Sequence, residues 1–454
     1  MEKSKMLRKM KEQVSRRLLR VVPVLLIALA ALSVAQAGGM KVEGVQPFAL
    51  SQPRVPALLR PADGGEPLTG KSAFRNQPAF AFPCFMDTGA SRMMLSVSAR
   101  KMLDVRATGE TVTDWGIGGT EEFGVSAPYR LCVAGSGANT SRAEDFRHCM
   151  PCVLQLRQKP PNMKGAMPGE MSEMLGDTVG KLGISPGEMM QMFSPQMNIV
   201  GSPFLKHHVA VMDPRPLKRM YGALNRMMGG MGGRNGDSQG PAGRLDSLFR
   251  LLEQSGVGGG TGPIDVDIMR ADESYNAPAL SVPLRMRDME EGPLPVTQAK
   301  VPFVPGAALQ NGNRTRRLDL LLDTGGAVSL ISRKVARELG VKLEQPRFTA
   351  PVLGVGGEGP MELEGYWLDR LVVPTRGDGA LVFEKVPFFV VDIDRLEGTL
   401  GLNLLLPSAY MDMDMEKMQK NPMGMLGSLK SGPMPFKRIV IDLPRRRLGL
   451  DPAK

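Results

Sequence analysis

The chain has 454 residues, of which 42% are hydrophobic, so it is long enough for two or three domains with a sizeable core. The formal net charge is +11, but eight basic and two acidic residues lie in the first 20 positions, and the remainder carries only +5. Because this excess is mild and no basic stripe is interleaved with aromatic residues, we expect no nucleic-acid partner.

The N-terminus has the pattern of an export signal. A basic segment precedes the apolar run VVPVLLIALAALSV at 21–34, and the small residues AQA follow at 35–37. This run is too short for a comfortable membrane span, so we expect a signal peptide over residues 1–37 and no stable membrane span after its cleavage. The mature protein is then periplasmic or secreted. An uncleaved leader that retains the chain as a signal anchor is the alternative.

All four cysteines lie in the first half of the chain. In an exported protein an even number predicts disulfides, although the spacing does not give their pairing. The segment HCMPC at 148–152 leaves a redox pair or half of a metal site as alternatives. We favour one or two structural bridges and predict no metal site. The disulfide candidates are Cys84, Cys132, Cys149 and Cys152.

One stretch of the sequence occurs twice. MDTGASRMMLSVSARKMLDV at 86–105 aligns without gaps on LDTGGAVSLISRKVARELGV at 322–341. Apolar positions coincide, and Ser96 falls on Ser332, where each hydroxyl can cap a short helix. Each copy therefore predicts a strand, an Asp-Thr-Gly turn, a second strand and a short helix.

The correspondence continues downstream in the same order. GIGG at 116–119 matches GVGG at 354–357, and NIVGSPFL at 198–205 matches GTLGLNLL at 398–405. An ordered series of elements that occurs twice indicates an internal duplication. The sequence thus predicts a mostly-β protein with two similar halves.

Composition divides the mature chain into three parts. We expect an N-terminal lobe over 38–221 with a Met/Pro-rich insertion at about 136–195, and a Gly-rich linker with a short helix over 222–264. A C-terminal lobe follows over 265–454, with an insertion at about 407–435. Both insertions are expected to be loops with short helices. Residues 38–70 could form a propeptide or a first strand, and the sequence leaves this open.

The Asp-Thr-Gly turn suits one kind of chemistry. Apolar residues before each Asp place it at the end of a buried strand, and the Gly permits a tight turn. Two such turns facing each other would bring two carboxylates close enough to share one proton. One carboxylate could then act as a general base for water while the other, protonated, acts as a general acid.

These motifs resemble those of the aspartic protease clan, which includes retropepsin-like and pepsin-like enzymes. CFMDTGASRMML and NIVGSPFL carry the resemblance in the first half, LLLDTGGAVSLI and TLGLNLL in the second. WGIGG and LGVGG resemble the flap tips of retroviral-type proteases. The resemblance implies a bilobed acid-protease fold, with two pseudo-symmetric retropepsin-like β-barrel lobes in one chain and few short helices.

By position, the resemblance implies that Asp87 and Asp323 form a catalytic dyad. It implies support of the active site by Thr88, Gly89, Thr324 and Gly325. It also implies flaps that bind substrate, with ordinary hairpin turns as the alternative. Asp114 is expected on a flap surface, with contact to the substrate as the alternative. The flap candidates are Trp115, Gly116, Gly118, Gly119, Gly354, Gly356 and Gly357.

The expected function is that of an aspartic-type endopeptidase that hydrolyses an extended polypeptide with a water activated between two carboxylates. The expected enzyme is a monomer and requires no cofactor. The alternative is a catalytically inactive bilobed protein that binds peptide in the same cleft. A weaker alternative is that each lobe pairs with the matching lobe of another chain.

Overall fold

The computed structural model describes residues 39–71, 78–159, 197–219, 262–289, 293–352, 354–356, 361–377, 379–393, 395–411 and 429–453. The predicted signal peptide, most of the predicted linker with its helix, Gly357, and large parts of both predicted insertions lie outside the described residues. Within the described ranges the chain is mostly β, which confirms the predicted fold class. The division into two lobes remains a prediction.

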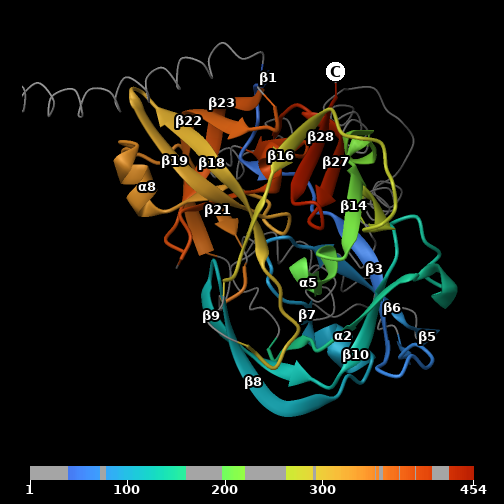
Figure 1. The fold of residues 1–454 in the computed structure, drawn as a ribbon. Helices are drawn as coiled ribbons and strands as arrows, with labels where there is room; N and C mark the ends of the chain where they lie inside the picture. The colour runs from blue at the N-terminus through green and yellow to red at the C-terminus, as the bar shows by residue number, and fades with distance from the viewer. Residues whose placement is uncertain are drawn as a thin grey trace, which may run out of the picture.

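The first half of the chain builds one large curled sheet, with nine strands among the described residues. Figure 1 shows its β8–β9 hairpin sweeping around the lower end of the molecule. In spatial order the strands are β11 (His148–Cys152), β10 (Tyr129–Val133), β3 (Arg54–Pro61), β6 (Ala81–Met86), β13 (Ile199–Val200), β7 (Met94–Leu95), β12 (Gln155–Arg157), β9 (Gly119–Ser126) and β8 (Ala107–Gly116).

Two of these strands lie in the segment that the sequence predicted as an insertion of loops and short helices. β11 pairs antiparallel with β10 along its whole length, and β12 pairs with both β7 and β9. The prediction was therefore wrong for residues 148–152 and 155–157. Non-local pairing supplies the backbone hydrogen bonds there, although the segment itself lacks a strand-like alternation of apolar residues. The prediction was also wrong for parts of the second predicted insertion, where β25 (Ser408–Met411) pairs with β26 (Leu429–Ser431).

The second half builds a corresponding sheet, also with nine strands in the described part. β17 (Arg285–Arg287) pairs with β18 beside the main path. In spatial order that path contains β1 (Met40–Val42), β23 (Ala380–Val390), β20 (Leu330–Ile331), β24 (Gly398–Leu400), β19 (Arg314–Leu322), β18 (Val301–Asn311), β22 (Met361–Pro374) and β21 (Phe348–Val352).

The two sheets repeat the same local pattern. Helix α2 (Val97–Met102) follows β7, and helix α8 (Arg333–Glu338) follows β20. Ser96 Oγ accepts a hydrogen bond from the amide of Ala99, and Ser332 Oγ accepts one from the amide of Val335. Both predicted helix caps are therefore confirmed.

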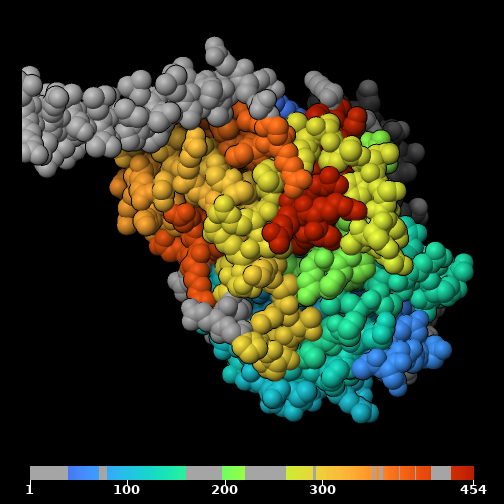
Figure 2. Space-filling view, in the orientation of Figure 1, coloured from blue at the N-terminus to red at the C-terminus, as the bar shows by residue number. Residues whose placement is uncertain are grey.

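A third sheet joins the two halves. Its five described strands are, in order, β15 (Asp265–Arg270), β14 (His208–Asp213), β27 (Phe436–Asp442), β28 (Arg447–Pro452) and β16 (Leu280–Pro283). β14 follows the short helix α5 (Ser202–Leu205) of the first half and pairs with β27 of the second. Figure 2 shows the red C-terminal strands flanked by yellow chain, between the cyan and orange parts of the molecule.

The N-terminal strand also crosses between the halves. β1 runs parallel to β23, with Met40 opposite Leu381, so the described chain begins as an edge strand of the second sheet before it enters the first. This pairing agrees with the first-strand interpretation of residues 38–70. The smaller elements are β2 (Phe48–Ala49), which pairs with β25 (Ser408–Met411), β26 (Leu429–Ser431) beside β25, and the pair β4 (Gly70–Lys71) and β5 (Pro78–Ala79).

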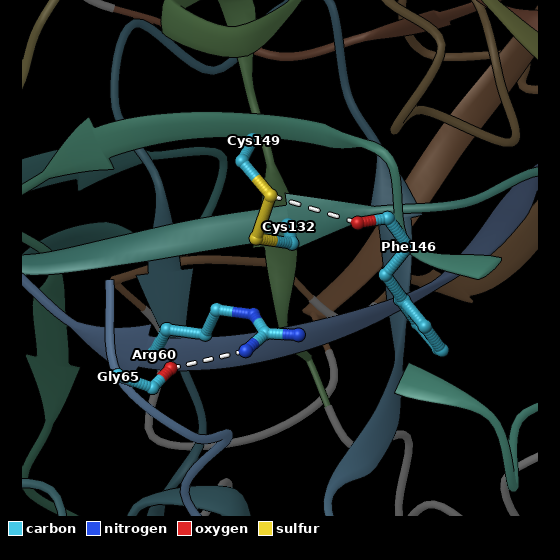
Figure 3. The surroundings of a disulfide bond; sticks show 5 residues. All are labelled: Arg60, Gly65, Cys132, Phe146 and Cys149. Carbon is cyan, nitrogen blue, oxygen red and sulfur yellow. Dashed lines mark hydrogen bonds between the residues drawn. A yellow bond between two sulfur atoms is a disulfide. The ribbon is translucent and has the colours of Figure 1, made fainter. Parts of the chain in front are cut away.

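Two of the four disulfide candidates pair. The β10–β11 register sets Cys132 opposite Cys149, and their sulfur atoms are bonded (Figure 3). Cys84 lies opposite Val55 and Cys152 opposite Tyr129, and both are buried free thiols. One bridge, rather than two, therefore forms, because only one cysteine pair shares a register position.

No helix in the described ranges has the length and apolar character that a membrane crossing needs. The described residues also contain no group of three or more His, Cys, Asp or Glu side chains arranged to hold a metal ion.

Candidate active site

The two Asp-Thr-Gly turns begin where two buried strands end. β6 ends at Met86 and β19 ends at Leu322, so Asp87 and Asp323 are the first residues beyond their strands. The amide of Asp87 donates to the carbonyl of Val200 at 3.0 Å, and the amide of Asp323 donates to the carbonyl of Leu400, also at 3.0 Å. Each Asp is thus fixed by the parallel strand beside it, β13 or β24.

Each carboxylate is held by its own turn. Asp87 Oδ1 accepts from the amides of Gly89 at 2.8 Å and Ala90 at 3.1 Å. Asp323 Oδ1 accepts from the amides of Gly325 at 3.0 Å and Gly326 at 2.8 Å. These paired bonds orient both carboxylates before any substrate arrives.

The turn glycines allow the two carboxylates to approach each other. A Cβ atom at Gly325 would lie 2.3 Å from Cγ of Asp87, and one at Gly89 would lie 3.0 Å from Oδ1 of Asp323. The first distance is far inside van der Waals contact, so a side chain at Gly325 would displace the opposite carboxylate. The glycine in each turn therefore leaves room for the carboxylate of the facing turn, in addition to forming its own turn.

The threonines of the two turns interlock beneath the carboxylates. The Thr88 hydroxyl donates to the carbonyl of Leu322 at 2.5 Å and accepts from the amide of Thr324 at 3.1 Å. The Thr324 hydroxyl makes the mirror pair of bonds, to the carbonyl of Met86 at 2.7 Å and from the amide of Thr88 at 3.0 Å. Both threonines are fully buried. The two halves are thereby locked together at the site.

The surroundings favour a proton on the Asp pair. Burial, followed by the negative charge of Asp323, raises the pKa of Asp87 well above the ordinary range of a carboxyl. Burial also raises the pKa of Asp323. Two carboxylates at such close range cannot both ionise easily, so the pair holds one proton over a wide pH range. The arrangement can supply a general acid and a general base together.

Two loops meet above the Asp pair. The β8–β9 hairpin turns at Ile117 and Gly118, and the amide of Gly118 donates to the carbonyl of Val355 at 3.0 Å. A Cβ at Gly356 would lie 2.0 Å from the carbonyl oxygen of Gly119, so these backbones are in close contact. Figure 1 shows the hairpin tip reaching the end of β21. The tips thus cover one side of the site.

A cavity of about 430 Å³ lies between these tips and the Asp pair. Both carboxylates and the turn glycines Gly89 and Gly325 line it, together with Trp115. Its size suits a few side chains of an extended peptide. Of the predicted flap residues, those lining the cavity are Trp115, Gly116 and Gly354.

An N-terminal segment that precedes both duplicated motifs in the sequence supports the second turn. The amide of Ala49 donates to the carbonyl of Ala327 at 2.8 Å, and the side-chain amide of Gln52 donates to the carbonyl of Gly325. Sequence reasoning missed this support, because nothing in the sequence around Gln52 marks it as a neighbour of a turn 273 residues away.

The predicted site residues fall into two groups. The structure brings together the two Asp-Thr-Gly turns and the described tip residues, whereas the disulfide candidates lie away from the cavity lining. Asp114 was expected on a flap surface, but its side chain is only 19% exposed because it pairs with Arg92, and this expectation was wrong. Both residues line the cavity, as does Gln155. In the alignment of the two copies, Arg92 stands opposite Val328, and this charged residue at an apolar position was a signal in the sequence that the two halves of the site differ.

The comparison with protein families points in the same direction. Residues 307–404 match a family model described as aspartyl protease. Among solved structures, the chain is similar to the crystal structure of a retropepsin-like aspartic protease from Rickettsia conorii, with 19% identity. That similarity covers 22% of this chain and 76% of the other, with a TM-score of 0.16. A search of curated proteins found no match.

Proposed function

We propose that this chain, which is related to the aspartic protease clan through residues 307–404, is an aspartic endopeptidase. The observation that carries the proposal is the interlocked pair of turns that presents Asp87 and Asp323 to one cavity. The duplicated motifs, with Asp, Thr and Gly intact in both copies, support the same proposal.

In the proposed reaction the Asp pair starts with one proton. The ionised carboxylate takes a proton from water, whose oxygen bonds to the carbonyl carbon of the peptide, while the protonated carboxyl gives its proton to the carbonyl oxygen. The tetrahedral intermediate then breaks its C–N bond. The amine nitrogen takes the proton held by one carboxyl, and a hydroxyl of the intermediate returns its proton to the other carboxylate as the carbonyl reforms. The pair therefore again holds one proton.

The substrate we propose is an extended polypeptide that lies beneath the two tips. Gly116 and Gly354 of the tips line the cavity, where an extended chain can add backbone hydrogen bonds as a further strand does. Because one chain supplies both Asp residues, we propose an active monomer. The Cys132–Cys149 disulfide supports an oxidising compartment, and hence an exported protein.

The test is digestion of an unfolded protein mixture from about pH 3 to about pH 8, with new termini identified by mass spectrometry. Wild type is compared with Asp87→Asn and Asp323→Asn, each checked for folding by circular dichroism, with and without a statine-type transition-state mimic. We expect cleavage by wild type that the inhibitor blocks and that both variants lack.

Cleavage retained in either variant would contradict the proposed mechanism. Absence of cleavage at every pH, with tight peptide binding by wild type and both variants, would instead support the inactive peptide-binding protein. Chain mass measured in solution alongside activity tests the monomer, since activity that appears only in a dimer would favour pairing between chains.

A further inference from the structure

The duplication extends from the Asp turns into the walls of the cavity. Thr88 and Thr324 are 236 residues apart, and the same offset relates Arg92 to Val328. Asp114 corresponds to Val352, because each lies two residues before the first glycine of its tip. All four of these wall residues line the cavity. An ion-pairing couple in one half therefore replaces an apolar couple in the other.

At a third pair of equivalent positions the first half again has a polar residue and the second half an apolar one. β12 runs parallel to β7 and sets Gln155 opposite Met94, while β23 runs parallel to β20 and sets Phe389 opposite Leu330. The amide of Gln155 donates to the carbonyl of residue 93, and the amide of Phe389 donates to that of residue 329, both at 3.0 Å. Gln155 and Phe389 are therefore equivalent positions.

The first wall is a connected polar group, defined here as Arg92, Asp114 and Gln155. Arg92 Nη1 lies 3.1 Å from Asp114 Oδ2, and the side-chain amide of Gln155 donates to the same oxygen at 2.9 Å. The amide of Trp115 donates to Asp114 Oδ1 at 2.8 Å. The side chain of Arg92 is only 2% exposed. These contacts fix opposite charges side by side at the cavity surface.

The second wall is apolar, defined here as Val328 and Val352, which line the cavity, with Phe389, the counterpart of Gln155, outside the cavity lining. These residues belong to one hydrophobic cluster, to which Leu330 also belongs. The ring of Phe48 packs against that of Phe389, with centroids 5.3 Å apart. This wall offers surface that an apolar side chain can bury without loss of hydrogen bonds.

We propose that the two walls select different side chains on the two sides of the bond to be cleaved, so that the cleft fixes the direction of the peptide. The second wall takes a large apolar side chain. The first wall takes an uncharged side chain that both donates and accepts hydrogen bonds, with Asn and Gln the best match. This inference rests on the proposed function, since its occupant is a peptide.

The chemistry of the first wall gives the reason. An amide can donate N–H to the Asp114 carboxylate and accept from the Arg92 guanidinium. An apolar side chain would remove water from the partly exposed Asp114 carboxylate without replacing its hydrogen bonds. A charged side chain would add a third charge to a neutralised pair, at a cost in desolvation.

The experiment is cleavage profiling of a peptide library that varies the residues on both sides of an apolar core. For wild type we expect Asn and Gln enriched on one side only, and Leu, Phe and Met on the other, each by about tenfold. The triple variant Arg92→Val, Asp114→Val, Gln155→Phe copies the second wall. In it we expect the amide preference to be replaced by an apolar one, with the other side unchanged.

Single variants test the wall should the triple variant not fold. In Asp114→Asn the Arg92 charge remains, so the preference should move to Asp and Glu. In Arg92→Gln the Asp114 charge remains, so the preference should move to Lys and Arg. Val328→Ala is the matched control, since it should alter only the apolar side. Equal preferences on both sides in wild type, or single variants without these shifts, would overturn the inference.

A binding arm separates this inference from the proposed function. The same library is selected for binding to Asp87→Asn, with and without the wall substitutions. Absence of cleavage by wild type, with one-sided amide selection in the binding arm, would overturn the protease but support the wall assignment. Cleavage by wild type with no one-sided selection would support the protease but overturn the wall assignment.

Discussion

Thr88 and Thr324 each accept, through their hydroxyl oxygen, the backbone amide proton of the other, at 3.1 and 3.0 Å. Each hydroxyl also donates across the junction, to Leu322 or Met86. Both residues are fully buried, so no water can replace these bonds. The interlock therefore ties the position of each Asp to the fold of the opposite half.

Removing one hydroxyl should weaken the whole structure. Thr88→Val keeps the shape of the side chain but leaves the amide of Thr324 and the carbonyl of Leu322 without a buried partner. We expect a loss of about 3 kcal/mol in the free energy of unfolding, measured by urea denaturation. Thr88→Ser, which keeps the hydroxyl, should lose much less. Equal losses in both variants would show that the methyl group, and not the hydrogen bonds, matters.

The Asp pair should make stability depend on pH. The folded state raises the pKa of Asp87, through burial and the charge of Asp323, so folding favours the protonated form. The stabilising proton is fully bound below the unfolded value near pH 4, and stability falls as pH rises toward the raised folded value. Asp87→Asn removes this penalty. We expect its melting temperature to exceed that of wild type by an amount that grows from about pH 4 upward.

The control for this pH series is Asp272→Asn, at an exposed carboxylate that does not line the cavity. Its melting curve should follow wild type at every pH. A constant difference between Asp87→Asn and wild type across the series would mean that the Asp pair carries no extra proton in the folded state.

The strands beside the Asp turns depend on two equivalent glycines. A Cβ at Gly201 would lie 2.0 Å from the carbonyl oxygen of Arg92, and one at Gly401 would lie 2.0 Å from that of Val328. Because these neighbours are backbone atoms, Gly201→Ala and Gly401→Ala should each cost about 3 kcal/mol, measured by denaturation. Gly137→Ala, which meets nothing within 4 Å, should be neutral. A neutral Gly401→Ala would show that this loop can shift freely.

Much of this site follows from local sequence. Three features were predictable from the sequence: the Asp-Thr-Gly turns, the helix caps at Ser96 and Ser332, and the segments NIVGSPFL and GTLGLNLL that follow downstream. The turns and caps depend on neighbours within a few residues. The duplication then related the two halves without any structure. Local turn chemistry and helix capping thus gave the centre of the site.

The parts of the fold and of the site that the sequence did not predict depend on contacts between distant segments. The pairing of β1 with β23, and of β14 with β27, joins strands whose own sequences would pair with many partners. The support that Gln52 gives to Gly325 and the pairing of Arg92 with Asp114 likewise exist only after folding. For this reason the sequence located the Asp turns but not the polar wall beside them.

Contact between the two tips should matter for substrate more than for folding. Gly356 has φ +86° and its backbone approaches Gly119. Gly356→Ala should separate the tips and lower kcat/KM by about tenfold or more, with a fall in melting temperature no larger than that of Gly377→Ala, since separation of the tips relieves the clash and leaves only the strain of positive φ. Gly377→Ala is the matched control, since Gly377 has φ +91° with open space around it. Equal effects of both substitutions on kcat/KM would mean that backbone strain, not tip contact, is responsible.

The Cys132–Cys149 disulfide closes a loop with a sequence separation of 17 on the β10–β11 pair (Figure 3). Closing a loop of this length restricts the unfolded chain, so Cys132→Ala with Cys149→Ala should cost about 3 kcal/mol, measured by urea denaturation. Cys152→Ala, at a buried free thiol, is the control that alters packing without opening a loop. Reduction of wild type should reproduce the double variant and leave that variant unchanged. A double variant as stable as wild type would show that strand pairing alone holds this edge of the sheet.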